Sequence, residues 1–258
     1  MMRGKLYMSI IIVLGIMIGA AMGAVNHVHY VDQAKQPNGF TNFLFRGGTP
    51  CVTNSGGGMT FDYPSLVLAL RNASKLAGVS LPQNFRILDV NLENNDQGDV
   101  DFTRTYTEWL FFLENSSLGQ FSYWQTQGTQ SNATLINSNN SNYLQYLVST
   151  LPVWDSDLLT SRIPKLRSML NQYYDSNIVI YGHCDCGCDR TGEIFGSYYM
   201  AYQGMSWEHV NSLNAQIAGR PMCCSNYLMM QFYCLYLNQD PPRPPLNCLS
   251  TQPCDVNC

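Results

Sequence analysis

Charged side chains are scarce in this sequence. Only 12% of its 258 residues are Asp, Glu, Lys or Arg, and 18 acidic residues outnumber 14 basic ones, giving a formal net charge of −4. A chain without a basic excess offers little attraction to nucleic acid or to an anionic membrane surface. So low a charge content is also unusual for a cytosolic enzyme. We therefore expect no nucleic-acid partner, and a surface suited to secretion.

Long apolar runs are also missing after the N-terminus. The single run, positions 8–23, follows a basic start and ends in small residues, with Ala21 and Gly23 suitably placed for cleavage after Gly23. This pattern predicts a secretory signal peptide over 1–23. The run approaches the ~20 residues of a membrane-spanning helix, so an uncleaved membrane anchor is the alternative. We expect a secreted or lumenal protein, bound to a membrane only if this segment stays in place.

Glycosylation sequons agree with that location. The Asn-x-Ser/Thr pattern occurs at four positions, and three of them lie in a polar stretch, 115–142, that we predict to be an exposed loop. The four are Asn72, Asn115, Asn132 and Asn139. The expected organisation is a signal peptide, one domain over 24–238 and a Pro- and Cys-rich tail over 239–258, with its Pro-rich part as an extended spacer.

The most informative stretch joins a short strand to a helix. Residues 176–180 have the pattern of a short buried strand, ending in the apolar, β-branched run Ile178-Val179-Ile180, and 193–202 have the pattern of a helix. A tight loop before a helix N-terminus directs backbone N–H groups at one point, where the helix dipole adds positive charge. The sequence therefore predicts an anion-binding loop. Cys184 stands at its entrance and Arg190 at its exit.

This spacing, His-Cys-x5-Arg-Thr-Gly, resembles the phosphate-binding loop of the cysteine-dependent protein tyrosine and dual-specificity phosphatases. The resemblance implies an α/β fold with a central, mostly parallel sheet flanked by helices. It also implies that Cys184 is the nucleophile, that Arg190 grips two phosphate oxygens, and that Thr191 supports the leaving thiolate. His183 would pack behind the loop and tune the thiolate. The remaining phosphate-binding positions would be Asp185, Cys186, Gly187, Cys188 and Asp189.

The family also places an aspartic acid about thirty residues before the cysteine, where it protonates the leaving oxygen. Asp155 lies 29 residues before Cys184 and is our first candidate, with Trp154 beside it to hold the segment down. Asp157 is the alternative, although we expect it or Ser156 to cap the following helix. The resemblance implies a two-step reaction through a phosphocysteine, on a phosphorylated protein or a small phosphomonoester, with no metal or organic cofactor.

Three other interpretations compete with this one. The His-Cys-x-Cys-x-Cys run contains residues that bind zinc, but its spacing lacks the paired knuckles of structural zinc sites and leaves the Arg-Thr-Gly unexplained. An inactive, phosphate-binding relative of the phosphatases would keep the loop without turnover. A disulfide-rich structural protein would contain the string by chance and would oxidise Cys184.

The number of cysteines constrains their pairing. The chain has ten, all of them after the predicted cleavage site. If Cys184 stays free, nine remain, so at least one other is unpaired or bonded to a partner protein. We expect this to be Cys186 or Cys188, and expect neighbouring thiols to make the loop sensitive to oxidation.

Charge in the loop bears on the substrate. Asp185 and Asp189 stand at the rim, and no lysine is present between Cys184 and Arg190. Close like charges repel by ~1 kcal/mol or more, which predicts a preference for phosphotyrosine or another singly phosphorylated monoester over polyphosphoinositides. For Asp189 we expect a structural role as well, in an ion pair or as an acceptor of loop amides.

Periodicity predicts further elements. A helix begins at Asp62 and ends before Gly78, a strand covers 85–93, and a helix covers 105–113 with Trp109 in the core. Residues 143–148 alternate as a strand. The acidic run 93–101 is expected to be a solvated loop.

Overall fold

The structure, a computed structural model, describes residues 25–96, 98–128, 136, 141–239, 245–249 and 254–255. The predicted signal peptide and the sequons at Asn132 and Asn139 lie outside the described residues. A five-stranded sheet organises the fold, in the order β1-β2-β7-β5-β6. Its strands are β1 (His29–Lys35), β2 (Thr41–Gly48), β5 (Arg86–Asn91), β6 (Gly119–Tyr123) and β7 (Ile178–Cys184).

All pairings in this sheet are parallel except that of β1 with β2. Strand β7 is central, and every one of its residues is buried, as expected for a parallel strand covered on both faces. Cys184 lies opposite Gly48 of β2, and His183 lies opposite Asn91 of β5. The carboxyl ends of three strands therefore meet where the predicted loop begins.

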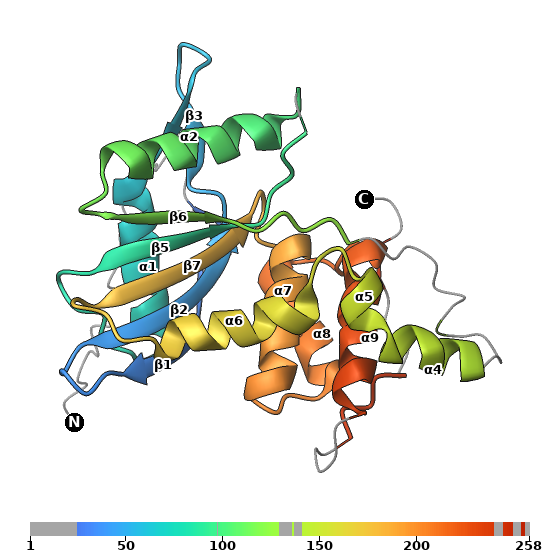
Figure 1. The fold of residues 1–258 in the computed structure, drawn as a ribbon. Coiled ribbons are helices and arrows are strands. Elements are labelled where there is room, and N and C mark those ends of the chain that lie inside the picture. The colour runs from blue at the N-terminus through green and yellow to red at the C-terminus, as the bar shows by residue number, and fades with distance from the viewer. Residues whose placement is uncertain are drawn as a thin grey trace, which may run out of the picture.

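Helices cover the sheet on both faces (Figure 1). One face packs its apolar side chains, such as Phe45 and Val179, against α1 (Tyr63–Leu76) and α2 (Val100–Glu114). The other face, with Leu44 and Ile180, packs against a larger helical group. That group consists of α4 (Ser141–Ser149), α5 (Leu151–Trp154), α6 (Leu159–Asn171), α7 (Asp189–Tyr202), α8 (Trp207–Ala218) and α9 (Cys224–Leu237).

A short antiparallel pair, β3 (Cys51–Thr53) and β4 (Met59–Phe61), leads into α1. The predicted bounds of α1 are confirmed: the Asp62 carboxylate accepts a hydrogen bond from Ser65 N, and Gly78 follows the helix at φ +69°. The predicted strand over 85–93 corresponds to β5. The ends of α1 could be predicted because the residues that begin and end this helix, Asp62 and Gly78, are recognisable in the local sequence.

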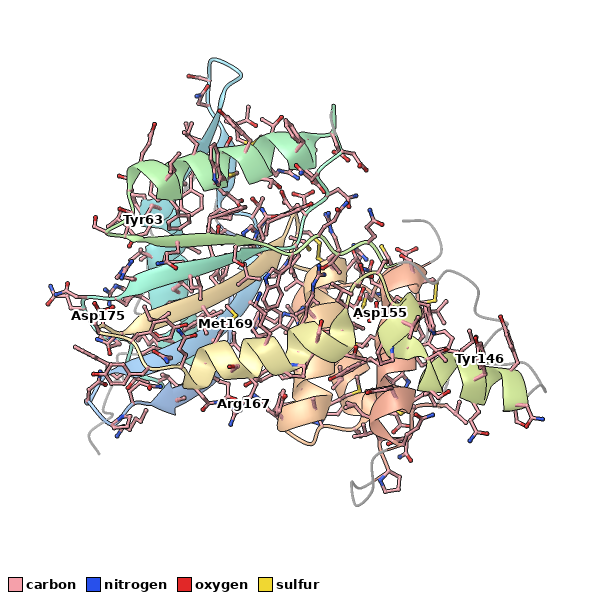
Figure 2. All side chains as sticks on the ribbon, in the orientation of Figure 1. Tyr63, Tyr146, Asp155, Arg167, Met169 and Asp175 are labelled. Atoms are coloured by element: carbon pink, nitrogen blue, oxygen red, sulfur yellow. A yellow bond between two sulfur atoms is a disulfide. The ribbon has the colours of Figure 1, made fainter. Side chains whose placement is uncertain are left out.

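The prediction of a strand at 143–148 is wrong. These residues belong to α4, in which Leu144, Leu147 and Val148 pack toward the core. Their spacing of three and four residues is helical, and the intervening polar residues imitate alternation. The predicted loop over 115–142 is also corrected, because it contains the edge strand β6, while Asn115 follows α2 as its C-cap. Figure 2 shows Tyr146 on α4, and this side chain is exposed.

Two expectations about α2 and the preceding segment are wrong. Trp109 is 43% exposed, because the inner face of α2 is formed by Asp101, Thr105, Glu108 and Phe112 instead. Glu93, expected in a solvated loop, is fully buried. The helix therefore turns polar side chains toward the end of the sheet, which makes it part of the candidate site.

The C-terminal region is tied to α9. Disulfides join Cys224 to Cys254 and Cys234 to Cys248, and Leu246 is buried. The described part of the tail is therefore packed, whereas the predicted spacer, 241–245, lies almost entirely outside the described residues. Within the described part of the chain, no helix is long and apolar enough to cross a bilayer.

Candidate active site

The predicted loop connects β7 to α7. Its position 187 adopts φ +76° and lies so close to β2 that a side chain there would meet the backbone of Gly47 and Gly48. Only glycine fits both conditions without strain. This confirms the conformational reason for a glycine in the middle of the loop.

Donors outside the loop bind three consecutive loop carbonyls. Thr49 N donates to Asp185 O (2.9 Å), His27 Nδ1 to Cys186 O (2.7 Å), and Arg46 Nη2 to Gly187 O (3.2 Å). In a trans peptide the carbonyl and the next N–H point in opposite directions. Fixing the carbonyls outward therefore turns the N–H groups of residues 186–188 toward the centre of the loop.

Cys184 ends β7, and its thiol is free and 2% exposed. Thr191 Oγ1, fully buried in the first turn of α7, donates to Cys184 Sγ over 3.2 Å. A hydroxyl donor and the start of a 14-residue helix both favour negative charge on sulfur. The structure thus brings together the two residues that the resemblance assigned to the nucleophile and its support.

Arg190 lies in the first turn of α7. Its Nη1 donates to Asp101 Oδ2 of α2 over 2.6 Å. Burial opposes the positive charge, but the neighbouring Cys184 and Asp101 charges outweigh it and raise the pKa of Arg190. Arg190 is therefore a fixed cation beside the candidate nucleophile.

A second arginine of α2 extends this arrangement to the beginning of the loop. Arg104 Nη1 contacts Asp101 Oδ1 (3.0 Å), and its Nη2 contacts Asp185 Oδ1 (2.9 Å). Asp185, Arg104, Asp101 and Arg190 thus form a chain of ion pairs from the first loop residue to the last. Asp101, Arg104 and Glu108 occur at i, i+3 and i+7, a spacing that places them on one face of a helix and could have identified them from the sequence.

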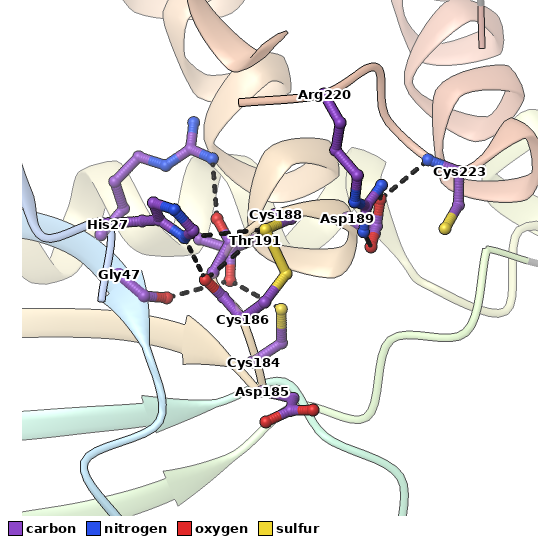
Figure 3. Close-up of a disulfide and its surroundings, with 12 residues drawn as sticks. His27, Gly47, Cys184, Asp185, Cys186, Cys188, Asp189, Thr191, Arg220 and Cys223 are labelled. Carbon is purple, nitrogen blue, oxygen red and sulfur yellow. Dashed lines mark hydrogen bonds and ion pairs between the residues drawn. A yellow bond between two sulfur atoms is a disulfide. The ribbon is translucent and has the colours of Figure 1, made fainter. Parts of the chain in front are cut away.

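Asp189 is bound by Arg220, whose Nη2 lies 2.6 Å from Asp189 Oδ2, and by the backbone N of Cys223 (2.8 Å). The predicted structural role of Asp189 is confirmed. Asp185 is paired as well, with Arg104, so both rim carboxylates have arginine partners. Figure 3 shows the pair of Asp189 and Arg220. These partners offset the charge of the rim carboxylates, and the predicted preference for singly phosphorylated monoesters stays a prediction.

His183 belongs to a buried ion cluster behind the loop. Its Nε2 lies 3.1 Å from Asp89 Oδ1 and 3.3 Å from Glu108 Oε2, and all three side chains are inaccessible to solvent. Burial lowers the pKa of His183, but the two carboxylates raise it well above its usual value. Burial also raises the pKa of Asp89 to about 7. Burial opposes ionisation of Glu108, but the charge of His183 outweighs it and lowers the pKa of Glu108, so a protonated His183 faces an ionised Glu108.

The same three residues form a group whose potential metal-ligand atoms all lie within 4.8 Å of one another. An imidazolium beside a carboxylate already balances the charge there. We interpret the group as a buried ion cluster that fixes the end of β7 behind the loop. Sequence reasoning missed Asp89 and Glu108, whose roles depend on elements far apart in the chain.

The two candidate acids lie between α5 and α6, where Figure 2 labels the first. Asp155 accepts hydrogen bonds from Asp157 N (2.8 Å) and from Leu159 N (2.7 Å), the first residue of α6. The N-cap of α6 is Leu158, so the expectation of a Ser156 or Asp157 cap is wrong. Burial raises the pKa of Asp155 to about 6. Asp157 accepts instead from the backbone N of Gln127 (2.7 Å) and Gly128 (2.8 Å).

Trp154 anchors the segment between α5 and α6 to the neighbouring helices. Its indole N–H donates to Leu147 O over 2.8 Å, and its ring packs edge-on against Phe232 of α9. The predicted role of Trp154 as an anchor therefore agrees with its contacts. The backbone between α5 and α6 is held on α4 and α9.

The cysteine pairing departs from expectation. Cys186 and Cys188 are bonded to each other inside the loop (Figure 3), and the second free thiol among the described residues is the buried Cys51. Cys186 and Cys188 were expected to include the unpaired cysteine, and this is wrong. Bonded to each other, these sulfurs are not the thiolate ligands that the zinc interpretation needs. Cys184 is free, unlike in the interpretation as a disulfide-rich structural protein.

Comparisons with known proteins add little to this geometry. No protein-family model matches the chain, and no curated protein matches it. Among solved structures, the chain is similar to the crystal structure of PTPMT1, a dual-specificity phosphatase, in complex with PI(5)P, at 13% identity. The match covers 83% of this chain and 99% of that chain, with a TM-score of 0.37. A likeness this distant carries no argument about substrate or activity.

Proposed function

We propose that the protein hydrolyses phosphomonoesters through a phosphocysteine, as a phosphatase of the protein tyrosine or dual-specificity type. One observation carries the proposal: the outward loop carbonyls of Asp185, Cys186 and Gly187 leave inward N–H groups around the free thiol of Cys184. Several converging amides and one arginine are what a phosphate dianion requires. The substrate class is a phosphorylated protein or a small phosphomonoester, within the secretory pathway.

In the first step, the Cys184 thiolate attacks phosphorus, and the bond to the leaving oxygen breaks. Arg190 and the loop amides hold the equatorial oxygens, on which charge is spread in the transition state. Asp155 gives its proton to the leaving oxygen. A phosphocysteine and a free alcohol or phenol result.

In the second step, water attacks the phosphocysteine, and Asp155 accepts the proton of that water. The hydroxyl of Thr191 donates a hydrogen bond to the departing thiolate of Cys184, as it already does to Cys184 Sγ in the structure. Asp155 suits both steps because a pKa of about 6 leaves both protonation states populated near neutral pH.

The test is hydrolysis of an aryl phosphate by the full chain under a reductant. We expect turnover by the wild type and loss of it in Cys184→Ser. Cys51→Ser is the matched control, because Cys51 is also a free, buried thiol. A rate that Cys184→Ser leaves unchanged would rule out the mechanism.

A catalytically inactive phosphate-binding protein is the second candidate. The observation that favours it is the hydrogen bonding of both acids: Asp155 and Asp157 each accept two backbone N–H groups, so neither is a free proton donor in this conformation. Binding of a phosphopeptide by the wild type without release of phosphate, under strong reductant, would select this alternative.

A further inference from the structure

We propose that the Cys186–Cys188 disulfide exchanges with dithiols, so that the loop carries a redox activity separate from phosphate hydrolysis. The substrate class is an exposed pair of thiols on a peptide or protein, and the product is their disulfide. The proposal rests on the disulfide and its surroundings, and it does not require Cys184 to be a phosphatase nucleophile.

The two sulfurs of this disulfide have different environments. Cys186 is half-buried, whereas Cys188 is 4% exposed. A thiolate from solvent therefore reaches the sulfur of Cys186, and Cys188 becomes the leaving group. Exchange is faster when the sulfur that leaves is a stabilised thiolate.

Cys188 has such stabilisation. It is the N-cap of α7, and the N–H groups and dipole of a helix N-terminus stabilise a thiolate there. His27 Nδ1, which carries a proton because it donates to Cys186 O, lies 3.7 Å from Cys188 Sγ. The same N–H can turn to the sulfur when the disulfide opens (Figure 3).

Nearby carboxylates do not oppose this charge. Asp189, next to Cys188 in sequence, is paired with Arg220, and Asp185 is paired with Arg104. The thiol of Cys184 is buried and accepts a hydrogen bond from Thr191, so external reagents meet Cys186 first.

The exchange is balanced as two displacements. A substrate thiolate bonds to Cys186 Sγ, the sulfur–sulfur bond breaks, and its electron pair stays on Cys188. The second substrate thiolate then attacks the substrate sulfur of the mixed disulfide and expels Cys186 as a thiolate. The substrate dithiol loses two electrons, the loop disulfide gains them, and the two substrate protons pass to solvent or to the loop thiols. A low-molecular-weight disulfide such as oxidised glutathione restores the loop.

The decisive experiment incubates the full chain with reduced glutathione, quenches with acid, and maps thiols and adducts by mass spectrometry. The disulfide Cys234–Cys248, buried between α9 and the tail, serves as the internal control. We expect Cys186–Cys188 to be reduced at least tenfold faster, with the transient glutathione adduct on Cys186. Equal rates for the two disulfides, or an adduct on Cys188, would overturn the proposal.

Variants separate this activity from hydrolysis. A dithiol peptide with oxidised glutathione should be oxidised catalytically by the wild type and by Cys51→Ser, but not by Cys186→Ser. His27→Ala should slow the reaction severalfold. Cys184→Ser should retain the exchange while losing phosphate release. An exchange rate equal in wild type and Cys186→Ser would refute the redox activity, whatever the outcome for hydrolysis.

Discussion

Carboxylates lie on two sides of the candidate site, and they are held in different ways. On the sheet side, Asp101 and Glu108 of α2 face Arg190 and His183. On the helical side, between α5 and α6, the hydrogen bonds that Asp155 accepts come from backbone N–H groups, and Arg162 acts on it through its charge, without an ion-pair contact among the described residues. A cation in direct contact keeps a carboxylate ionised, whereas burial without such a contact raises its pKa.

This difference divides the chemical work. The sheet side provides fixed charges, which position Arg190. In the proposed mechanism, the helical side provides Asp155, whose pKa of about 6 suits a proton donor and acceptor. The predictions below test whether the two sides are as distinct as their contacts imply.

The largest effect is expected for Asp155→Asn. The substitution should lower kcat by about 10²–10⁴, the usual contribution of a general acid. In the wild type the acid must be protonated, so activity should fall as the pH rises above about 6, and the variant should lose this dependence. The measurement is a pH–rate profile with an alkyl phosphate, whose leaving group needs the proton.

Asp157→Asn is the matched control, since both residues lie in one segment but Asp157 binds Gln127 and Gly128. If Asp157→Asn, rather than Asp155→Asn, removes the pH dependence, the assignment of the acid is wrong.

On the sheet side, Glu108→Gln should reduce the free energy of unfolding by about 3–5 kcal/mol, because it leaves the His183 charge buried without its ionised partner. Urea unfolding measures this. Glu114→Gln, at the exposed end of the same helix, should change it by less than about 0.5 kcal/mol. Similar losses in the two variants would show that the cluster does not stabilise the fold.

A smaller effect is expected for Asp101→Asn, which removes the charged partner of Arg190. We expect KM for an aryl phosphate to rise by about tenfold, which corresponds to about 1.4 kcal/mol of lost binding, with kcat much less affected. The exposed Asp96→Asn, just ahead of α2, is the control. A large fall in kcat with unchanged KM would instead place Asp101 in the chemical step.

The smallest effect concerns pH and stability. Burial, with the charge of Glu108 nearby, raises the pKa of Glu93 from 4.5 to about 9. Between these values the native state holds a proton that the unfolded state has lost, so stability falls as pH rises through this window. We expect Tm to drop by at least ~2–4 °C between pH 5 and pH 9. Glu93→Gln should reduce that slope; an unchanged slope would exclude Glu93 as its source.

Local patterns were enough for part of this molecule. The strand, the loop and the helix around Cys184 follow from apolar runs, a glycine and a helix start within about twenty-five residues. Asp62 and Gly78 bracket α1 for the same reason. The pattern failed at α4, where helical spacing and alternation look alike over six residues.

The sequence by itself determined that Cys184, Arg190 and Thr191 share one loop, because their spacing and the strand before them are local properties of the chain. Only the tertiary structure decided what surrounds them. The Arg104–Asp185 ion pair and the Asp89–Glu108–His183 cluster join residues from different elements, and Cys186 bonds to Cys188 while Cys51 stays free. Such pairings depend on how the strands are ordered in the sheet and which helix covers its edge. The energies involved are those of burial and charge, which no short window of sequence contains.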